Sequence, residues 1–120
     1  MIELLVVIAI IGLLAATILT SLNSARTNAR NIQRVTSLKQ LENALELYFT
    51  EFRSYPLATT VCNTPATAGD NDNYGLQILV TRGVISQISR DPQGQCYVYA
   101  TPNNPLPQTF HLGATLEDKN

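Results

Sequence analysis

Charged side chains are missing from residues 4–25, which form an almost unbroken apolar run. No Lys or Arg precedes Arg26, whereas a cleavable signal peptide would begin with basic residues. A soluble core helix is rarely apolar on every side for so many turns. About 22 uncharged helical residues cover roughly 33 Å, enough to cross the hydrocarbon core of a bilayer. The sequence therefore predicts a membrane-spanning helix.

Proline is absent before Pro56, and Gly12 is the only glycine in that stretch. The residues after the apolar run are good helix formers, so we expect one helix over about residues 2–53, roughly 78 Å long. Its second half carries an apolar stripe at steps of three and four residues. The stripe consists of Leu38, Leu41, Leu45, Tyr48 and Phe52. Pro56 disfavours helical geometry at Tyr55 and predicts the end of the helix nearby.

Basic residues follow the apolar run at four-residue steps, as Arg26, Arg30 and Arg34. The positive-inside rule taken alone would place them in the cytoplasm. We interpret these arginines, with Glu42 and Glu46, as a solvated helix face. The alternative is that they pair with acidic groups on neighbouring subunits.

The remaining sequence has little regular structure and a net charge of −1, which gives no reason to expect a nucleic-acid partner. Residues 96–100 and 109–116 read as two strands, and residues 91–94 as a β-turn. Residues 74–81 fit a short helix or a strand equally well. An antiparallel strand pair packed on the apolar stripe predicts an α+β head.

Cysteine is scarce, with only Cys62 and Cys96. An even count beside an export-type apolar segment predicts one disulfide and an oxidising compartment. A basic leader that is later removed would reconcile this compartment with the arginines. Two free thiols in a metal or redox site are the alternative, but no second CxxC or paired histidine accompanies them. His111 stands alone and is interpreted as a strand residue.

No other motif indicates chemistry. The acidic and amide residues 70–73 followed by Gly75 look superficially like a calcium loop, but no glutamate follows at the required distance. A polar surface loop is the preferred interpretation. We find no nucleophile–base pair and no phosphate loop, and we predict neither a metal, a cofactor nor an enzyme activity.

The opening residues 2–16, IELLVVIAIIGLLAA, place one glutamate before aliphatics, a glycine and paired alanines. This run resembles the N-terminal signature of type IV pilins and type II secretion pseudopilins. Residues 22–26 with 38–56 are similar to the helix and proline stop of these families. Residues 90–94 before Tyr97 and Tyr99 are similar to the turn and strand of pseudopilin heads.

The resemblance implies a type IV pilin fold, in which the second half of the long helix packs on a small antiparallel sheet. We expect residues 1–25 to form the transmembrane or filament-core helix and residues 26–120 the head. Processed family members carry an aromatic residue and one more before this run, so we expect the chain either to lack these residues and the leader or to be numbered from an internal Met. Many relatives also have a proline where this chain has Thr20.

Glu3 is the predicted assembly residue, because a carboxylate in an apolar helix is costly unless it is paired. By resemblance, it pairs with the N-terminal amine of an adjacent subunit and sets the axial register. The alternative is a helix-start carboxylate that the macrodipole favours. Positions where the helix could stretch are Gly12, Thr17, Thr20 and Ser21. Without proline at position 20, we expect a mostly continuous helix.

These features predict a structural subunit of an extracellular type IV pilus-like filament, a helical homo-oligomer assembled through the apolar helices. Before assembly, the subunit would lie in the cytoplasmic membrane. Its assembly would depend on a prepilin peptidase and the pilus assembly machinery. A type II secretion pseudopilin is the alternative within the family. A membrane-anchored binding protein that never polymerises is the alternative outside it. The sequence leaves motility, adhesion and DNA uptake open.

Overall fold

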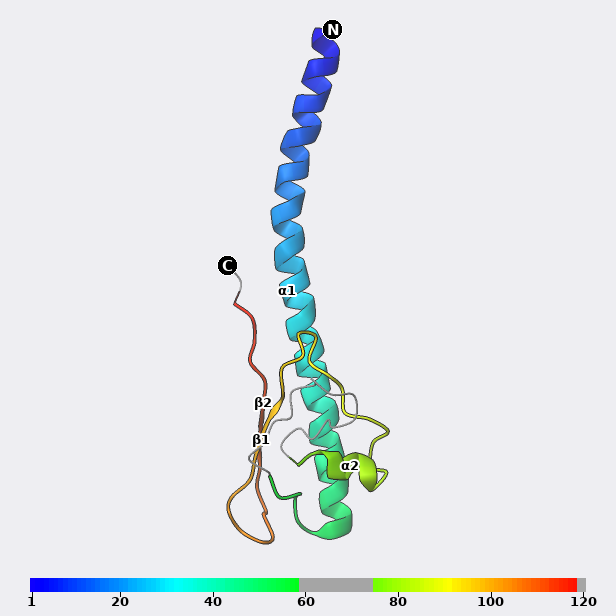
Figure 1. Ribbon diagram of the computed structural model, residues 1–120, viewed down its shortest axis with the longest axis vertical. Coiled ribbons are helices and arrows are strands. Elements are labelled where there is room, and N and C mark those ends of the chain that lie inside the picture. The colour runs from blue at the N-terminus through cyan, green and yellow to red at the C-terminus, as the bar shows by residue number, and fades with distance from the viewer. Residues whose placement is uncertain (59–74, 119–120) are drawn as a thin grey trace. The chain divides into compact units, whose positions relative to one another are not determined.

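The computed structural model describes residues 1–58 and 75–118 (Figure 1). Its elements are α1 (Ile2–Phe52), α2 (Gln77–Thr81), β1 (Val98–Ala100) and β2 (His111–Gly113). The chain divides into two compact units. The first comprises Met1–Asn31 with Glu117–Asn120, and the second comprises Ile32–Leu116. This combination of a long helix and a small antiparallel sheet confirms the predicted α+β pilin fold.

Helix α1 is continuous over 51 residues, as the run of helix formers predicts. It ends at Phe52, one residue before the predicted end, because Arg53 adopts a left-handed conformation with φ 57°. The N–H of Arg53 still donates to the carbonyl of Phe49 at 2.8 Å, which satisfies one carbonyl of the last turn. The chain then turns away before Pro56.

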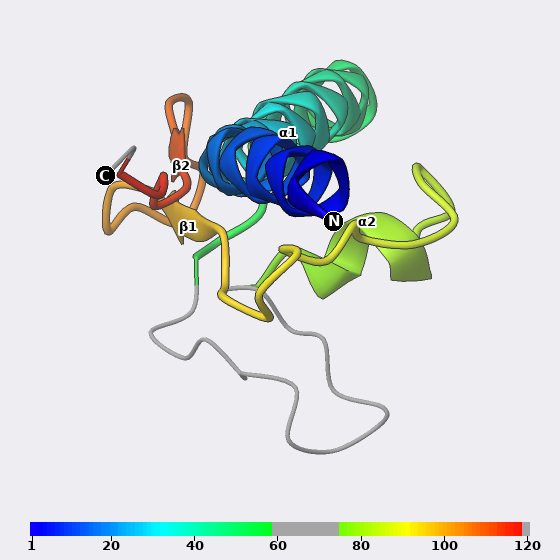
Figure 2. The ribbon, with the colours of Figure 1, turned by 90° about the horizontal axis from the view of Figure 1, so that it is seen from above.

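The core of the second unit forms on the predicted stripe. Leu41 and Leu45 are buried, and Leu38 and Tyr48 pack against the core from its edge. In that unit, α2 and the β1–β2 pair lie on different sides of α1 (Figures 1 and 2). Leu79 of α2 and Tyr99 of β1 belong to the same buried cluster, as do Leu76 and Tyr97, which directly precede these two elements. This is the packing that the sequence predicts for the strand pair.

The strands are shorter than predicted but have the expected orientation. β1 and β2 pair antiparallel, with Tyr99 opposite Leu112. The Tyr99 side chain is buried, and its hydroxyl donates to the carbonyl of Pro56 at 2.7 Å. Burial raises the pKa of the Tyr99 hydroxyl far above its ordinary value. The hydrogen bond from Tyr99 to Pro56 connects β1 to the segment that follows α1.

Residues 77–81 form a helix, which settles the ambiguity of the sequence in that region. Leu76 and Leu79 lie three residues apart on one side of this single turn, and both are fully buried. Gly83, with φ 73°, follows the turn, and its N–H donates to the carbonyl of Val80 at 2.9 Å. Glycine tolerates this left-handed conformation without a steric penalty.

Candidate functional site

The first half of α1 exposes apolar side chains that the chain itself does not cover. An 18-residue window has a mean hydropathy of 2.8, and none of it is buried in the structure. Its large side chains are all exposed, including Leu4, Leu13 and Leu19. Each such side chain gains about 1.5–3 kcal/mol when it is removed from water. A bilayer, or other copies of the helix, must therefore cover this segment.

Glu3 lies in the first turn of α1 and is fully exposed. The amino group of Met1 lies 3.0 Å from its carboxylate. The negative charge also has a favourable position relative to the helix dipole. The predicted pairing with an adjacent subunit stays a prediction.

The positions predicted to be weak points are helical in this chain. The Thr17 hydroxyl donates to the carbonyl of Leu14 at 2.8 Å, and the Thr20 hydroxyl donates to the carbonyl of Thr17 at 2.9 Å. These bonds satisfy both hydroxyls within the helix, so neither needs a polar partner in an apolar surrounding. Ser21 continues the helix, and a Cβ at Gly12 would meet nothing within 4 Å. The open space at Gly12 leaves room for a neighbouring helix to approach.

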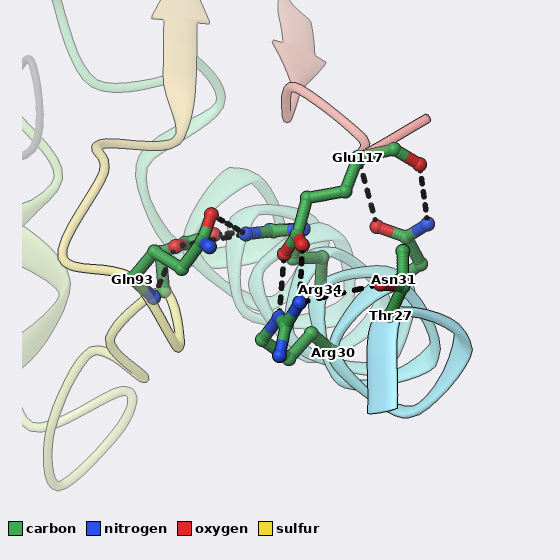
Figure 3. A network of polar contacts seen from close by, with 7 residues as sticks. Thr27, Arg30, Asn31, Arg34, Gln93 and Glu117 are labelled. Atoms are coloured by element: carbon green, nitrogen blue, oxygen red, sulfur yellow. Dashed lines mark hydrogen bonds and ion pairs between the residues drawn. The ribbon is translucent and has the colours of Figure 1, made fainter. Parts of the chain in front are cut away.

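Glu117 is fixed against α1 in the first unit by two neighbouring side chains (Figure 3). Arg30 binds its carboxylate with two parallel bonds, Nε to Oε1 at 2.7 Å and Nη2 to Oε2 at 2.5 Å. Asn31 binds its backbone in both directions, donating to the carbonyl and accepting from the N–H, each at 3.0 Å. The three residues form what we call the Glu117 clasp.

Arg34 is buried in the second unit, with only 1% of its surface exposed. Its guanidinium pairs with the buried carboxylate of Asp91. It also donates to Gln93 Oε1 at 3.1 Å (Figure 3). Burial raises the pKa of the Asp91 carboxyl, but the bonds from Arg34 and from the N–H of Gln93 outweigh it and hold the pKa below its usual value. Asp91 also opens the predicted turn, its carbonyl accepting from the N–H of Gly94 at 2.9 Å.

These pairs correct the interpretation of Arg30 and Arg34 as part of a solvated face, whereas Arg26 is exposed as predicted. Arg30 and Arg34 bind carboxylates of their own chain, at sequence separations of 87 and 57 residues. Glu42 does remain on the surface with Lys39, at 2.8 Å, and Glu46 accepts from the Tyr55 hydroxyl at 2.9 Å.

The predicted disulfide and the calcium-like loop concern residues 59–74, so Cys62 and residues 70–73 lie outside the described residues. Cys96 is half-buried, directly before the buried Tyr97. His111 is an exposed residue of β2, as predicted. Within the described ranges, no group of three His, Cys, Asp or Glu residues could hold a metal ion.

We expect the double variant Cys62→Ser/Cys96→Ser to lose up to about 3.8 kcal/mol of unfolding free energy, because a crosslink over about 34 residues restricts the unfolded chain. Mass spectrometry of non-reduced peptides should show the two cysteines linked. Thermal unfolding of the variant should match that of the reduced parent chain. Free thiols on both residues of exported material would contradict the prediction.

The chain resembles three curated proteins, each a type II secretion system core protein G. It is 30% identical to the protein of Vibrio cholerae serotype O1 over an alignment of 127 positions, which covers 95% of this chain and 77% of that relative. It is 29% identical to the Escherichia coli K12 protein over 85% of this chain, and 28% identical to the Aeromonas hydrophila protein.

No protein-family model matches the chain. No solved structure matches it either. The similarity to the Vibrio cholerae protein nevertheless extends over nearly the whole chain, through both the apolar helix and the head. Together with the long helix and the small antiparallel sheet, it shows that the chain belongs to the family of type IV pilins and type II secretion pseudopilins.

Proposed function

We propose that this membrane-anchored chain is a pseudopilin, a structural subunit of a filament that serves type II secretion. The similarity to core G proteins, over 85–95% of the chain, is the main support for the proposal. It favours the pseudopilus over the surface pilus, which the sequence alone puts first. The assembly role is common to both interpretations.

The exposed half of α1 supports assembly through the helix. Before assembly, lipid would cover residues 4–25, and the bilayer would hold the subunit as a single-pass protein. In the filament, the same residues of neighbouring copies would cover one another. Gly12, Ala15 and Ala16 are small enough to let two helix backbones approach closely. The partners are then identical subunits, a prepilin peptidase and the secretion assembly machinery.

A deletion strain tests this function. Loss of the gene should lower the extracellular amount of a defined set of proteins, measured by quantitative mass spectrometry of the medium, while the same proteins accumulate in the cells. The parent gene should restore their release. Unchanged release together with lost surface filaments would instead support the pilus, and no change in either would overturn both filament roles.

A matched control separates assembly from simple anchoring. In this control, residues 4–25 are replaced by an unrelated apolar helix of the same length, which keeps the head at the membrane. A filament subunit should fail to restore secretion with this anchor, because its helix–helix contacts are lost. Full rescue would favour a membrane-anchored binding protein that does not polymerise.

A further inference from the structure

Arg26 and Arg30 follow the apolar segment immediately and belong to the same compact unit. At 1.5 Å per residue, Arg30 lies about 7.5 Å beyond Ala25 along the helix. The headgroup layer of a bilayer is of similar thickness, about 5–8 Å on each side. A helix whose residues 4–25 cross the hydrocarbon therefore places both arginines at the level of lipid phosphates. A guanidinium binds phosphate and carboxylate with the same two-pronged geometry.

In the Glu117 clasp, the Glu117 carboxylate already forms this two-pronged contact with Arg30. Both parallel bonds are formed, at 2.7 and 2.5 Å. Asn31 holds the backbone of Glu117 independently of the carboxylate, so the position of the acid is built into the fold. The pair remains accessible, since 32% of the Arg30 side chain and 20% of the Glu117 side chain are exposed. Among the described residues, no carboxylate pairs with Arg26.

We propose that the Glu117 carboxylate competes with anionic lipid headgroups for Arg30 and so weakens the hold of the bilayer on the subunit. The inference rests on the membrane insertion of α1 proposed above. With the clasp closed, Arg26 alone presents an unneutralised guanidinium to the headgroups, and one fewer lipid contact must break when the subunit leaves the bilayer for the filament. When the Glu117 carboxylate does not pair with Arg30, both arginines bind lipid phosphate.

Glu117→Gln tests this competition, because it removes the charge but keeps the side-chain shape and the backbone bonds to Asn31. The full chain in detergent micelles is titrated with phosphatidylglycerol or phosphatidylcholine, and bound lipid is counted by native mass spectrometry. We expect the variant to bind phosphatidylglycerol about fivefold more tightly than the parent, because the charge of Arg30 near an anionic surface is no longer neutralised by Glu117. Phosphatidylcholine binding should not change.

Two further variants show whether the gain depends on the charge at position 117 and on Arg30. Glu51→Gln makes the same change of net charge at an exposed site of α1 and should leave lipid binding at the parent level. Arg30→Gln in the Glu117→Gln background should remove the gain. The proposal is overturned if Glu117→Gln leaves phosphatidylglycerol affinity unchanged, or if Glu51→Gln raises it equally. A parent chain that stays monomeric in water without detergent would instead overturn the membrane insertion itself.

Discussion

Replacing Asp91 by alanine is expected to lower the unfolding free energy of the head by about 3–5 kcal/mol. In the variant the Arg34 guanidinium stays buried, since only 1% of the Arg34 surface is exposed. Position 91 no longer supplies a carboxylate to neutralise it. Such a charge is far more costly inside a protein than in water. A loss of this size is a large part of the stability of a small domain. Denaturant titration of the full chain in detergent measures it, with near-UV circular dichroism of the buried Tyr97 and Tyr99 as the signal.

Asp118→Ala is the matched control, because it makes the same substitution at an exposed position. Its unfolding free energy should stay within about 0.5 kcal/mol of the parent. Arg34→Met combined with Asp91→Ala removes both charges, and this double variant should be more stable than Asp91→Ala alone. Equal stability of Asp91→Ala and Asp118→Ala would show that the buried pair contributes nothing to the head.

The same pair determines how the head responds to acid. The pKa of Asp91 is lower in the folded chain than its ordinary value of about 3.9, so the unfolded chain takes up the proton first. Its contribution to stability is therefore complete above about pH 4 and is lost as the pH falls through the lower folded pKa. When the pH is lowered from neutral into this acid range, the unfolding free energy of the parent should fall more than that of Asp91→Asn. This variant has no carboxyl to protonate at position 91.

The sequence predicts the features that depend on local residue patterns. The long helix follows from a stretch without proline, and the buried Leu41 and Leu45 follow from their spacing. The turn at residues 91–94 follows from its proline and glycine, and the structure confirms it through the bond between Asp91 and Gly94. Each of these signals lies within a few neighbouring residues, where short-range sterics and periodicity decide the outcome.

The ion pairs could not be predicted in this way. Arginines four residues apart indicate a solvated face, yet Arg34 lies on the buried side of α1 because Asp91 reaches it from a loop 57 residues away. Glu117 and Asn31 are separated by 86 residues, and no local motif marks either as a partner of the other. The sequence contains the charges but not the tertiary arrangement that matches them. Residues 77–81 are ambiguous for a simpler reason, since so short a run fits either period.

Glu3 presents the converse case, in which the local pattern is clear and the partner lies outside the subunit. Lipid tails and neighbouring apolar helices are nearly equivalent surroundings for residues 4–25, so burial of these residues alone does not favour the filament over the membrane. A carboxylate at the start of the helix is different, because an apolar surrounding favours it only when a cation or donor is present.

Glu3→Ala is therefore expected to leave the head folded and the subunit in the membrane. Its amount in filaments should fall by more than about tenfold, because the charge pair that would favour an adjacent subunit over lipid is lost. Shearing cells that overproduce the secretion system and quantifying the chain in the filament and membrane fractions measures this ratio. Glu51→Ala removes an exposed carboxylate from the other end of α1 and should assemble normally. Glu3→Gln keeps the shape without the charge and should fail as Glu3→Ala does, because an amide cannot neutralise an amine. Normal filament yield from both Glu3 variants would mean that helix packing alone selects the filament, and that the carboxylate serves only the start of the helix.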